Sequence, residues 1–125
     1  MIKDFFLVAT GSFFGGGLRF LVSRWAQSAA VGGFPFGTLT VNLIGCLALG
    51  FLSGLPFDGR LLTPHAKLLL TTGVCGGFTT FSTFMNEGAA LMKAGDYVSF
   101  SLYVAGSILL GLFFVVLGHQ LARLA

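Results

Sequence analysis

The sequence predicts an all-α membrane protein with four transmembrane helices, the third of which is broken near its middle. Of the 125 residues, 55% are hydrophobic and only 9% are charged, and the mean hydropathy is +0.93. Soluble domains contain about 25% charged residues, so this composition excludes an ordinary soluble domain. The charges also cluster, leaving uncharged runs at 5–18, 25–57, 68–86 and 97–122. A spanning helix needs about 20 mostly apolar residues, which the last three runs supply.

The first run is shorter because Arg19 and Arg24 interrupt it. A cleaved signal peptide is an alternative for this segment, since Lys3 precedes an apolar stretch and small residues follow at 28–30. However, Asp4 lies beside Lys3, and Arg19 falls inside what would be the apolar region of the signal. We therefore expect a first helix rather than a leader.

The whole chain, 1–125, is predicted to form one transmembrane domain. Turn residues follow or separate the apolar runs at 32–35, at Pro56 with Asp58-Gly59, and at Gly95-Asp96, and Thr63-Pro64 is suited to open a helix. The predicted helices are about 4–27, 36–55, 64–94 and 97–122.

Short loops require the helices to run alternately up and down. The amino terminus, the 56–66 loop and the carboxyl terminus then share one side, with Lys3, Arg60, Lys67 and Arg123, whereas Arg24 and Lys93 lie on the other. Cytoplasmic loops normally carry a clear excess of Lys and Arg. Four charges against two is a weak bias, so the sequence does not select one orientation.

The break is predicted within 71–84, where three glycines and several threonines make a poor continuous helix. Irregular backbone at membrane depth survives only where protein or a watery cavity satisfies its polar groups. Broken transporter helices place freed carbonyls around bound ions. A continuous helix whose glycines allow tight packing is the alternative.

Polar and aromatic residues near the break are candidates for an ion pathway. Phe81 and Phe84 are three residues apart and share a helix face, and their ring edges carry partial positive charge. Such a pair is also common in ordinary cores. Asn42, midway in the second helix, either joins helices or offers its NH₂ group to an anion, and Ser107 could orient or assist it.

Charged residues within the spans suggest function, because intramembrane charges are costly. Arg19 lies inside the first span, although its side chain could also extend toward the interface. Glu87 lies near the end of the third span and is either an entrance residue or a helix-end charge. Neither His65 nor His119, both near helix ends, is assigned a role.

Several function classes are disfavoured. No acidic residue lies near the centre of a span, which argues against a proton-coupled carrier and favours passive conduction. No nucleophile–base pair or metal-ligand spacing supports an enzyme. The net charge of +3 is too small to indicate nucleic-acid binding. Cys46 and Cys75 lie in apolar runs, where cysteine behaves as a small hydrophobe.

Three motifs stand out in the sequence: Gly11-x-x-x-Gly15-x-x-x-Arg19-Phe20, Gly37-Thr38-Leu39-x-Val41-Asn42-x-x-Gly45 and Gly76-Gly77-Phe78-Thr79-Thr80-Phe81-Ser82-Thr83-Phe84. They resemble the motifs of the small fluoride channels called Fluc or CrcB, and the resemblance spans all four helices. The resemblance implies a passive channel in the cytoplasmic (inner) membrane that exports fluoride. It further implies an antiparallel homodimer whose subunits insert in both orientations.

The resemblance also implies roles for individual residues. Fluoride would pass a pore lined by Phe81, Phe84, Asn42, Ser107, Ser82 and Thr83, with Arg19 and Glu87 near its entrances. The backbone carbonyls of Gly76 and Thr79 from both subunits would hold a structural sodium ion. Gly111 departs from the family, which often has a further hydroxyl at that position. Phe20 and Ser12 replace a commoner Tyr and a commoner Gly.

Two rival functions remain at this point. The first is a small multidrug-type proton-coupled antiporter, which has similar length and helix count. The second is a non-transporting helical subunit that packs against a larger partner. Proton coupling would identify the first, and failure of the purified chain to move any ion would identify the second.

Overall fold

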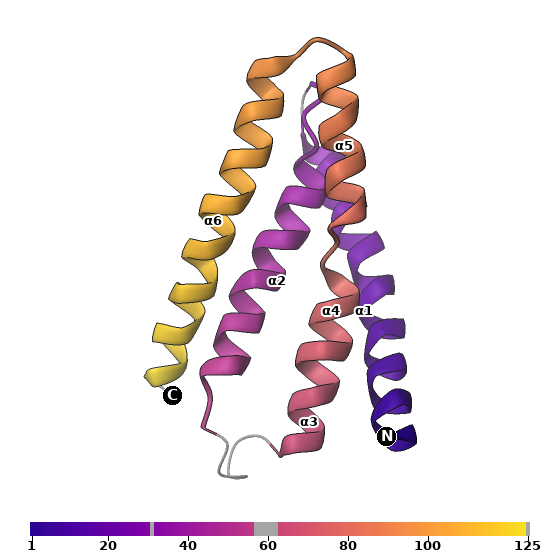
Figure 1. Ribbon diagram of the computed structural model, residues 1–125, viewed down its shortest axis with the longest axis vertical. Helices are drawn as coiled ribbons and strands as arrows, with labels where there is room; N and C mark the ends of the chain where they lie inside the picture. Colours follow the sequence, from indigo (N-terminus) through magenta and orange to yellow (C-terminus); the bar gives the residue numbers. More distant parts are fainter. Residues whose placement is uncertain (31, 57–62, 125) are drawn as a thin grey trace.

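The computed structural model describes residues 1–30, 32–56 and 63–124 and is helical throughout its regular elements. Four segments are long and apolar enough to cross a membrane, which confirms the predicted fold class. Figure 1 shows them running alternately up and down, with both termini at the same end of the molecule. The predicted Asp58-Gly59 turn and Arg60 lie outside the described residues.

The helices have the following bounds. They are α1 (Ile2–Ala29), α2 (Phe36–Gly54), α3 (Pro64–Leu68), the π-helical η1 (Leu69–Cys75), α4 (Gly76–Phe78), α5 (Ser82–Lys93) and α6 (Tyr97–Arg123). The third span comprises α3, η1, α4 and α5. The first span extends two residues beyond the predicted range at each end, and the other outer bounds differ from the predicted ones by at most one residue.

Local signals explain where the helices begin and end. Pro64 occupies the first turn of α3, and the Thr63 hydroxyl accepts a hydrogen bond from the Ala66 N–H at 3.1 Å. Gly95, with φ +79°, turns the chain between α5 and α6, where a residue with a Cβ would be strained. The Asp96 carboxylate then caps α6 by accepting from the Ser99 N–H at 3.1 Å.

The third span is interrupted at Thr79, Thr80 and Phe81, between α4 and α5, which confirms the predicted break. Thr79 is extended, with φ −83° and ψ 162°, so the chain leaves the helix at that residue. The sequence did not predict the π-helical turn before the break. Its hydrogen bonds are shifted by one residue relative to an α-helix, a feature that recurs at functional sites.

Glycines permit the closest helix contacts. A Cβ at Gly11 would lie 2.6 Å from the Leu69 carbonyl oxygen, and one at Gly15 would overlap the Val74 carbonyl oxygen. Between α2 and α6, a Cβ at Gly50 would overlap the Val115 carbonyl oxygen. These glycines therefore let the helix backbones approach closely, as expected where lipid removes the hydrophobic drive between helices.

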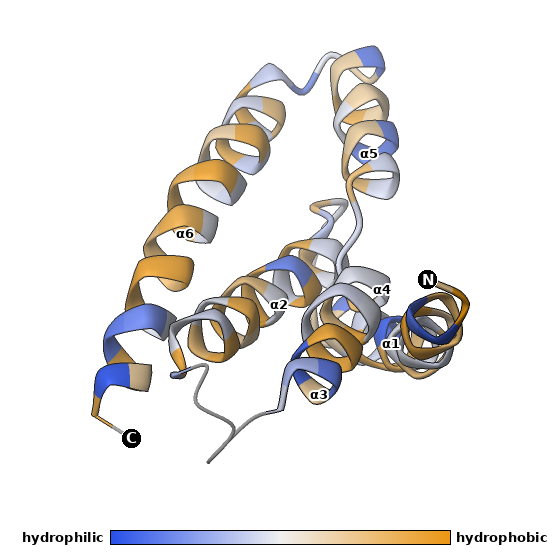
Figure 2. Cartoon of the chain, turned by 60° about the horizontal axis from the view of Figure 1, so that its bottom comes forward, coloured by the Kyte–Doolittle hydropathy of each residue, from blue (hydrophilic) through white to orange (hydrophobic). Residues whose placement is uncertain are grey.

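The protomer leaves most of its apolar side chains on the surface. Val41 and Tyr103 are its largest fully buried side chains, whereas large apolar residues along α1 and α6 are exposed. In Figure 2, which colours the chain by hydropathy, most of α6 is coloured as hydrophobic, and α5 and α6 lie apart from α1. Such a surface requires a lipid environment, a second protein chain, or both.

The α1 contact yields a stability prediction. We expect Gly15→Ala to lower the free energy of unfolding by about 1–3 kcal/mol, because the added methyl group meets rigid backbone. Gly17→Ala, in the same helix, is the control, since a Cβ there meets nothing within 4 Å. Denaturation of both variants in mixed micelles would measure the difference. Equal stability of the two would contradict the α1 packing described here.

Candidate functional site

The Asn42 side chain clamps the break in the third span. Its Nδ2 donates to the Thr80 carbonyl at 2.9 Å, and its Oδ1 accepts from the Thr80 N–H at 2.9 Å. One amide therefore satisfies both backbone polar groups of Thr80, which lies outside the helices on either side of it. Because NH₂ carries two hydrogens, one donor of Asn42 remains for another partner.

This clamp diverts the hydrogen bonds that a continuous helix would make. In such a helix the Thr80 N–H would bond the Gly76 carbonyl, but it bonds Asn42 instead. Likewise, the Thr83 N–H would bond the Thr79 carbonyl, but it donates to the Thr80 hydroxyl at 3.3 Å. The carbonyls of Gly76 and Thr79 are thus left without their helical donors.

Two cavities, each of about 380 Å³, meet at the break. The first, here the arginine cavity, is lined by residues that include Gly16, Arg19, Arg24, Thr38, Thr80 and Thr83. The second, here the phenylalanine cavity, is lined by residues that include Asn42, Gly76, Thr79, Phe81, Phe84 and Ser107. Thr80 lines both, so the clamped residue lies where the two cavities adjoin.

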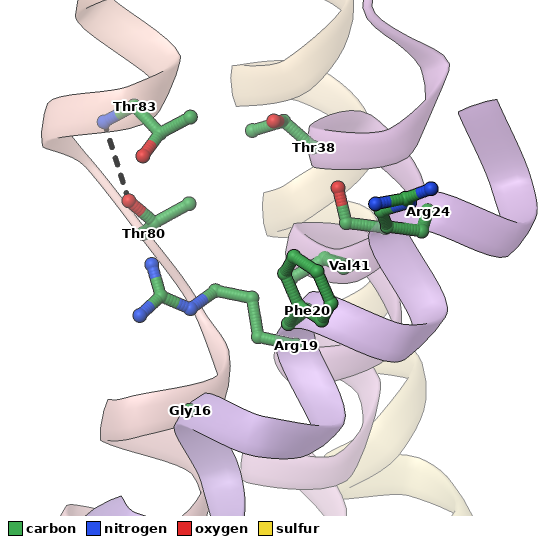
Figure 3. Close-up of a pocket in the computed structure, with 9 residues that line it drawn as sticks. Gly16, Arg19, Phe20, Arg24, Thr38, Val41, Thr80 and Thr83 are labelled. Atoms are coloured by element: carbon green, nitrogen blue, oxygen red, sulfur yellow. Dashed lines mark hydrogen bonds between the residues drawn. The ribbon is translucent and has the colours of Figure 1, made fainter.

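Arg19 supplies one of the two positive charges in the lining of the arginine cavity, and Arg24 supplies the other. Figure 3 shows its side chain extending from α1 toward the break, with Thr80 and Thr83 on the facing wall. Arg19 is half-buried, and among the described residues it has no carboxylate partner within ion-pair distance. Its charge and the surrounding hydroxyls are therefore available to an anion.

The aromatic wall of the phenylalanine cavity is held by ring contacts. The Phe81 and Phe84 centroids are 6.2 Å apart with an interplanar angle of 60°, and Phe84 makes a T-shaped contact with Tyr103 at 5.0 Å. Phe84 is only 6% exposed, whereas Phe81 is 71% exposed. Phe84 is thus fixed in the protomer, and Phe81 projects from it.

A second polar network anchors Tyr103. Its hydroxyl donates to Glu87 Oε1 at 3.1 Å and also hydrogen-bonds the buried Thr38. This arrangement connects α2, α5 and α6 behind the Phe84 ring. Glu87 therefore helps to position the aromatic wall, and it also lines a third cavity with Gln27 and Asp96.

Ser107 has an unused polar group in the phenylalanine cavity. Its Oγ is buried and finds no hydrogen-bond partner among the described residues. Leaving a buried hydroxyl unpaired is costly, so such a group calls for a partner that is absent from the protomer. A small anion in the cavity would accept its hydrogen bond.

The predicted site residues do not all line the same cavity. Phe81, Phe84, Asn42 and Ser107 line one cavity together with Gly76 and Thr79. Thr83 instead joins Arg19 in the arginine cavity. Ser82 is exposed at the start of α5 and is not among the residues that line these two cavities.

Sequence reasoning did not single out Thr80 and Thr38. Thr80 is recognised as functional only through its backbone pairing with Asn42, which lies 38 residues away in the chain. Thr38 is 4% exposed, and it is the polar side chain that is buried among the described residues of the core. Both lie in the motifs quoted above, but their partners come from other helices.

The comparisons with known proteins agree with this geometry. A profile of the family described as "CrcB-like protein, Camphor Resistance (CrcB)" matches residues 6–119. The chain belongs to the CrcB family. It is 48% identical over 124 residues to the "Fluoride-specific ion channel FluC" of Chlorobaculum tepidum, covering 99% of this chain and 98% of the relative. The channel of the same name from Aquifex aeolicus is 43% identical over 118 residues, covering 94% and 95%.

Family membership and the four apolar spans together make the chain a multi-pass integral membrane protein, which in bacteria resides in the cell membrane. Its relatives are named as channels, a class of transporter and not of enzyme.

The clamp yields a second prediction. We expect Asn42→Leu to lower the free energy of unfolding by about 1–3 kcal/mol, because it leaves the Thr80 N–H and C=O unpaired at similar side-chain volume. Amide exchange near Thr80 should also become faster. Asn86→Leu, at an exposed position of α5, is the control. Unchanged exchange at the break in Asn42→Leu would show that the clamp does not hold it.

Proposed function

We propose that this chain is a passive, fluoride-selective channel that exports cytoplasmic fluoride and so limits its toxicity. The observation that carries the proposal is the pair of cavities meeting at Thr80, one with an unpaired Arg19 and the other with ring edges and an orphaned Ser107 hydroxyl. The names of the most similar relatives support the same anion.

The proposed route begins in the arginine cavity. Positive charge in a concave, low-dielectric site concentrates anions, and Arg19 supplies such charge while the Thr80 and Thr83 hydroxyls donate hydrogen bonds. None of the described residues that line this cavity is acidic, so no fixed negative charge opposes an anion there.

The anion then passes Thr80 into the phenylalanine cavity. Fluoride is small and strongly hydrated, so the protein must replace the water that it loses. The remaining Asn42 N–H and the Ser107 O–H supply donors, and the Phe81 and Phe84 ring edges supply partial positive charge. Uncharged donors hold an anion weakly enough to let it leave, which conduction requires.

We also propose that the working unit is an antiparallel homodimer. One protomer leaves the phenylalanine cavity open-sided, with the Phe81 ring 71% exposed at its edge. A second copy would close that side. Charges near the two ends are close to balanced in the described residues, with Lys3, Lys67 and Arg123 opposite Arg24 and Lys93, which favours insertion in both orientations.

A structural sodium ion at the dimer centre is part of the proposal. The Gly76 and Thr79 carbonyls fit such an ion because the break has removed their helical donors. Carbonyls of unwound membrane helices are suitable sodium ligands. Two carbonyls are too few to replace the ion's hydration shell, and a second protomer would supply two more. The bound ion would contribute charge compensation and structure at the interface.

The rival functions are less well supported. A proton-coupled antiporter of the small multidrug type needs a carboxylate in its pathway, and neither of the two cavities has one among its described lining residues. A non-transporting subunit does not explain an orphaned hydroxyl and an unpaired arginine facing cavities. The relatives reported above are named as channels.

Efflux from liposomes that contain only this protein tests the function. We expect rapid fluoride release, little chloride release, and no dependence of fluoride release on an imposed proton gradient beyond its effect on membrane potential. Comparable fluoride and chloride rates would remove the selectivity claim. Strict coupling to protons would favour the antiporter, and no ion movement would favour the accessory subunit.

A third prediction concerns the rings. Phe81→Ile and Phe84→Ile keep bulk and apolarity but remove the positive ring edge, so each should lower fluoride flux at least tenfold, a change equivalent to about 1.4 kcal/mol in the barrier. Phe113→Ile, at a 59% exposed position of α6, is the matched control and should conduct normally. Gel filtration must first show intact protein. Full flux in both well-folded cavity variants would limit the rings to packing.

A fourth prediction concerns orientation. A reporter fused to the carboxyl terminus should be labelled from both faces of the membrane, because the end charges do not select one orientation. Adding two or three lysines beside Lys93 should shift the labelling to one face and lower flux. Labelling confined to one face of the unmodified protein would exclude the antiparallel homodimer.

A fifth prediction concerns sodium. Replacing sodium by potassium or N-methylglucamine at equal ionic strength should destabilise the purified dimer, measured by its dissociation on dilution and by its thermal midpoint. A cation that binds the folded dimer alone stabilises it by mass action. Identical dimer stability in all three salts would argue against a sodium site.

A further inference from the structure

A cysteine to which no function has been given lies in the wall of the phenylalanine cavity. Cys46 is a free, half-buried thiol, and it lines the cavity together with Asn42, Phe84 and Ser107. It follows Asn42 by four residues on α2, so the two side chains lie on one face of the helix, one turn apart. The Cys46 thiol and the Asn42 amide therefore form a row of polar groups along this face of α2.

A row of residues on α6, which packs against α2, shows why the position of Cys46 matters. Tyr103, Ser107 and Gly111 follow one another at intervals of four residues and share a helix face. The first two carry hydroxyls, but the third has no side chain. A Cβ at Gly111 would meet one neighbour within 4 Å, the Cys46 sulfur at 3.5 Å. The thiol thus occupies the space beside the gap that Gly111 leaves in the polar row.

We propose that Cys46 lines the ion pathway as its donor beside Gly111, and that it is consequently a site at which small thiol-directed electrophiles or soft metal ions close the pathway. The proposal rests on the function proposed above. An S–H group is a weak donor, and it can extend the sequence of donors formed by Asn42 and Ser107. Cys75 is the other thiol that lines this cavity, but it is buried in η1 and therefore less open to a reagent.

Methyl methanethiosulfonate is a suitable probe because it is small and uncharged. The Cys46 thiol loses its proton to solvent, and its sulfur attacks the CH₃S sulfur of the reagent. A new S–S bond forms to give Cys46–S–S–CH₃, the S–S bond of the reagent breaks, and methanesulfinate leaves. The added CH₃S group would occupy the space beside Gly111, and a reducing thiol would remove it.

The experiment compares fluoride flux before and after treatment of the reconstituted full chain. We expect the unmodified protein to lose most of its flux, about tenfold or more, and to recover it with dithiothreitol. Cys46→Ser should show no change on treatment, whatever its starting flux. Cys75→Ser should remain sensitive to the reagent. Mass spectrometry of the same samples reports which thiol is modified.

A rescue experiment separates a donor from a packing residue. Cys46→Ala should lower fluoride flux about threefold to fivefold, the change expected for the loss of one weak hydrogen bond. Gly111→Ser in the Cys46→Ala background should restore it, because the new hydroxyl enters the space that the Cys46 sulfur vacates, and a Cβ at Gly111 would lie at an ordinary 3.5 Å even from that sulfur. Gly111→Ala in that background adds the carbon without the donor and should not restore flux.

Several outcomes would overturn the inference. These are a Cys46 that stays unmodified in the conducting protein, a modified Cys46 that leaves flux unchanged, and equal rescue by Gly111→Ser and Gly111→Ala. Absence of fluoride flux before any treatment would instead overturn the proposed function, so the two failures are distinguishable. If Cys46→Ala fails to give intact protein, reagent sensitivity of the parent and Cys46→Ser decides the question.

Discussion

The paired hydrogen bonds between the Asn42 amide and the Thr80 backbone are the interaction on which the rest of this structure depends. Because the Thr80 backbone is satisfied by a side chain, α4 can end and α5 can begin a few residues later without leaving those polar groups unpaired at membrane depth. The bond from the Thr80 N–H to Asn42 also leaves the Gly76 carbonyl without its helical donor, and Thr80 lines both cavities. A single amide therefore fixes the residue of the break that lines both cavities.

The helices around this clamp enclose few buried side chains and leave cavities beside the break. Glycines bring α1 against η1 and α2 against α6 at backbone distance, so those helices pack without large side chains between them. Tyr103, fixed by Glu87 and Thr38, supports the buried Phe84 ring from behind. In the single protomer the Phe81 ring is exposed and the phenylalanine cavity is open on one side.

Much of the candidate site follows from the sequence alone, but its connectivity does not. The helical spacing of Phe81 and Phe84 predicts that they share one face, and they make the expected ring contact at 6.2 Å. For Asn42 the sequence allows two uses, and the structure shows the helix-joining one while leaving a second N–H for another partner. Thr83 is grouped with the rings by its motif yet lines the arginine cavity with Arg19, because it lies on a different face of α5 from Phe84.

The sequence by itself determined the four spans and the broken third helix, since hydrophobic run length, charge placement and local glycine content are properties of neighbouring residues. The up-and-down order also follows from short connections. Only the tertiary structure decided which groups meet: Thr80 with Asn42, Tyr103 with Glu87, and the Cys46 thiol with the gap at Gly111. These contacts join residues from different parts of the bundle. They depend on the rotation and depth of each helix, which are set by interhelical packing that no local pattern encodes.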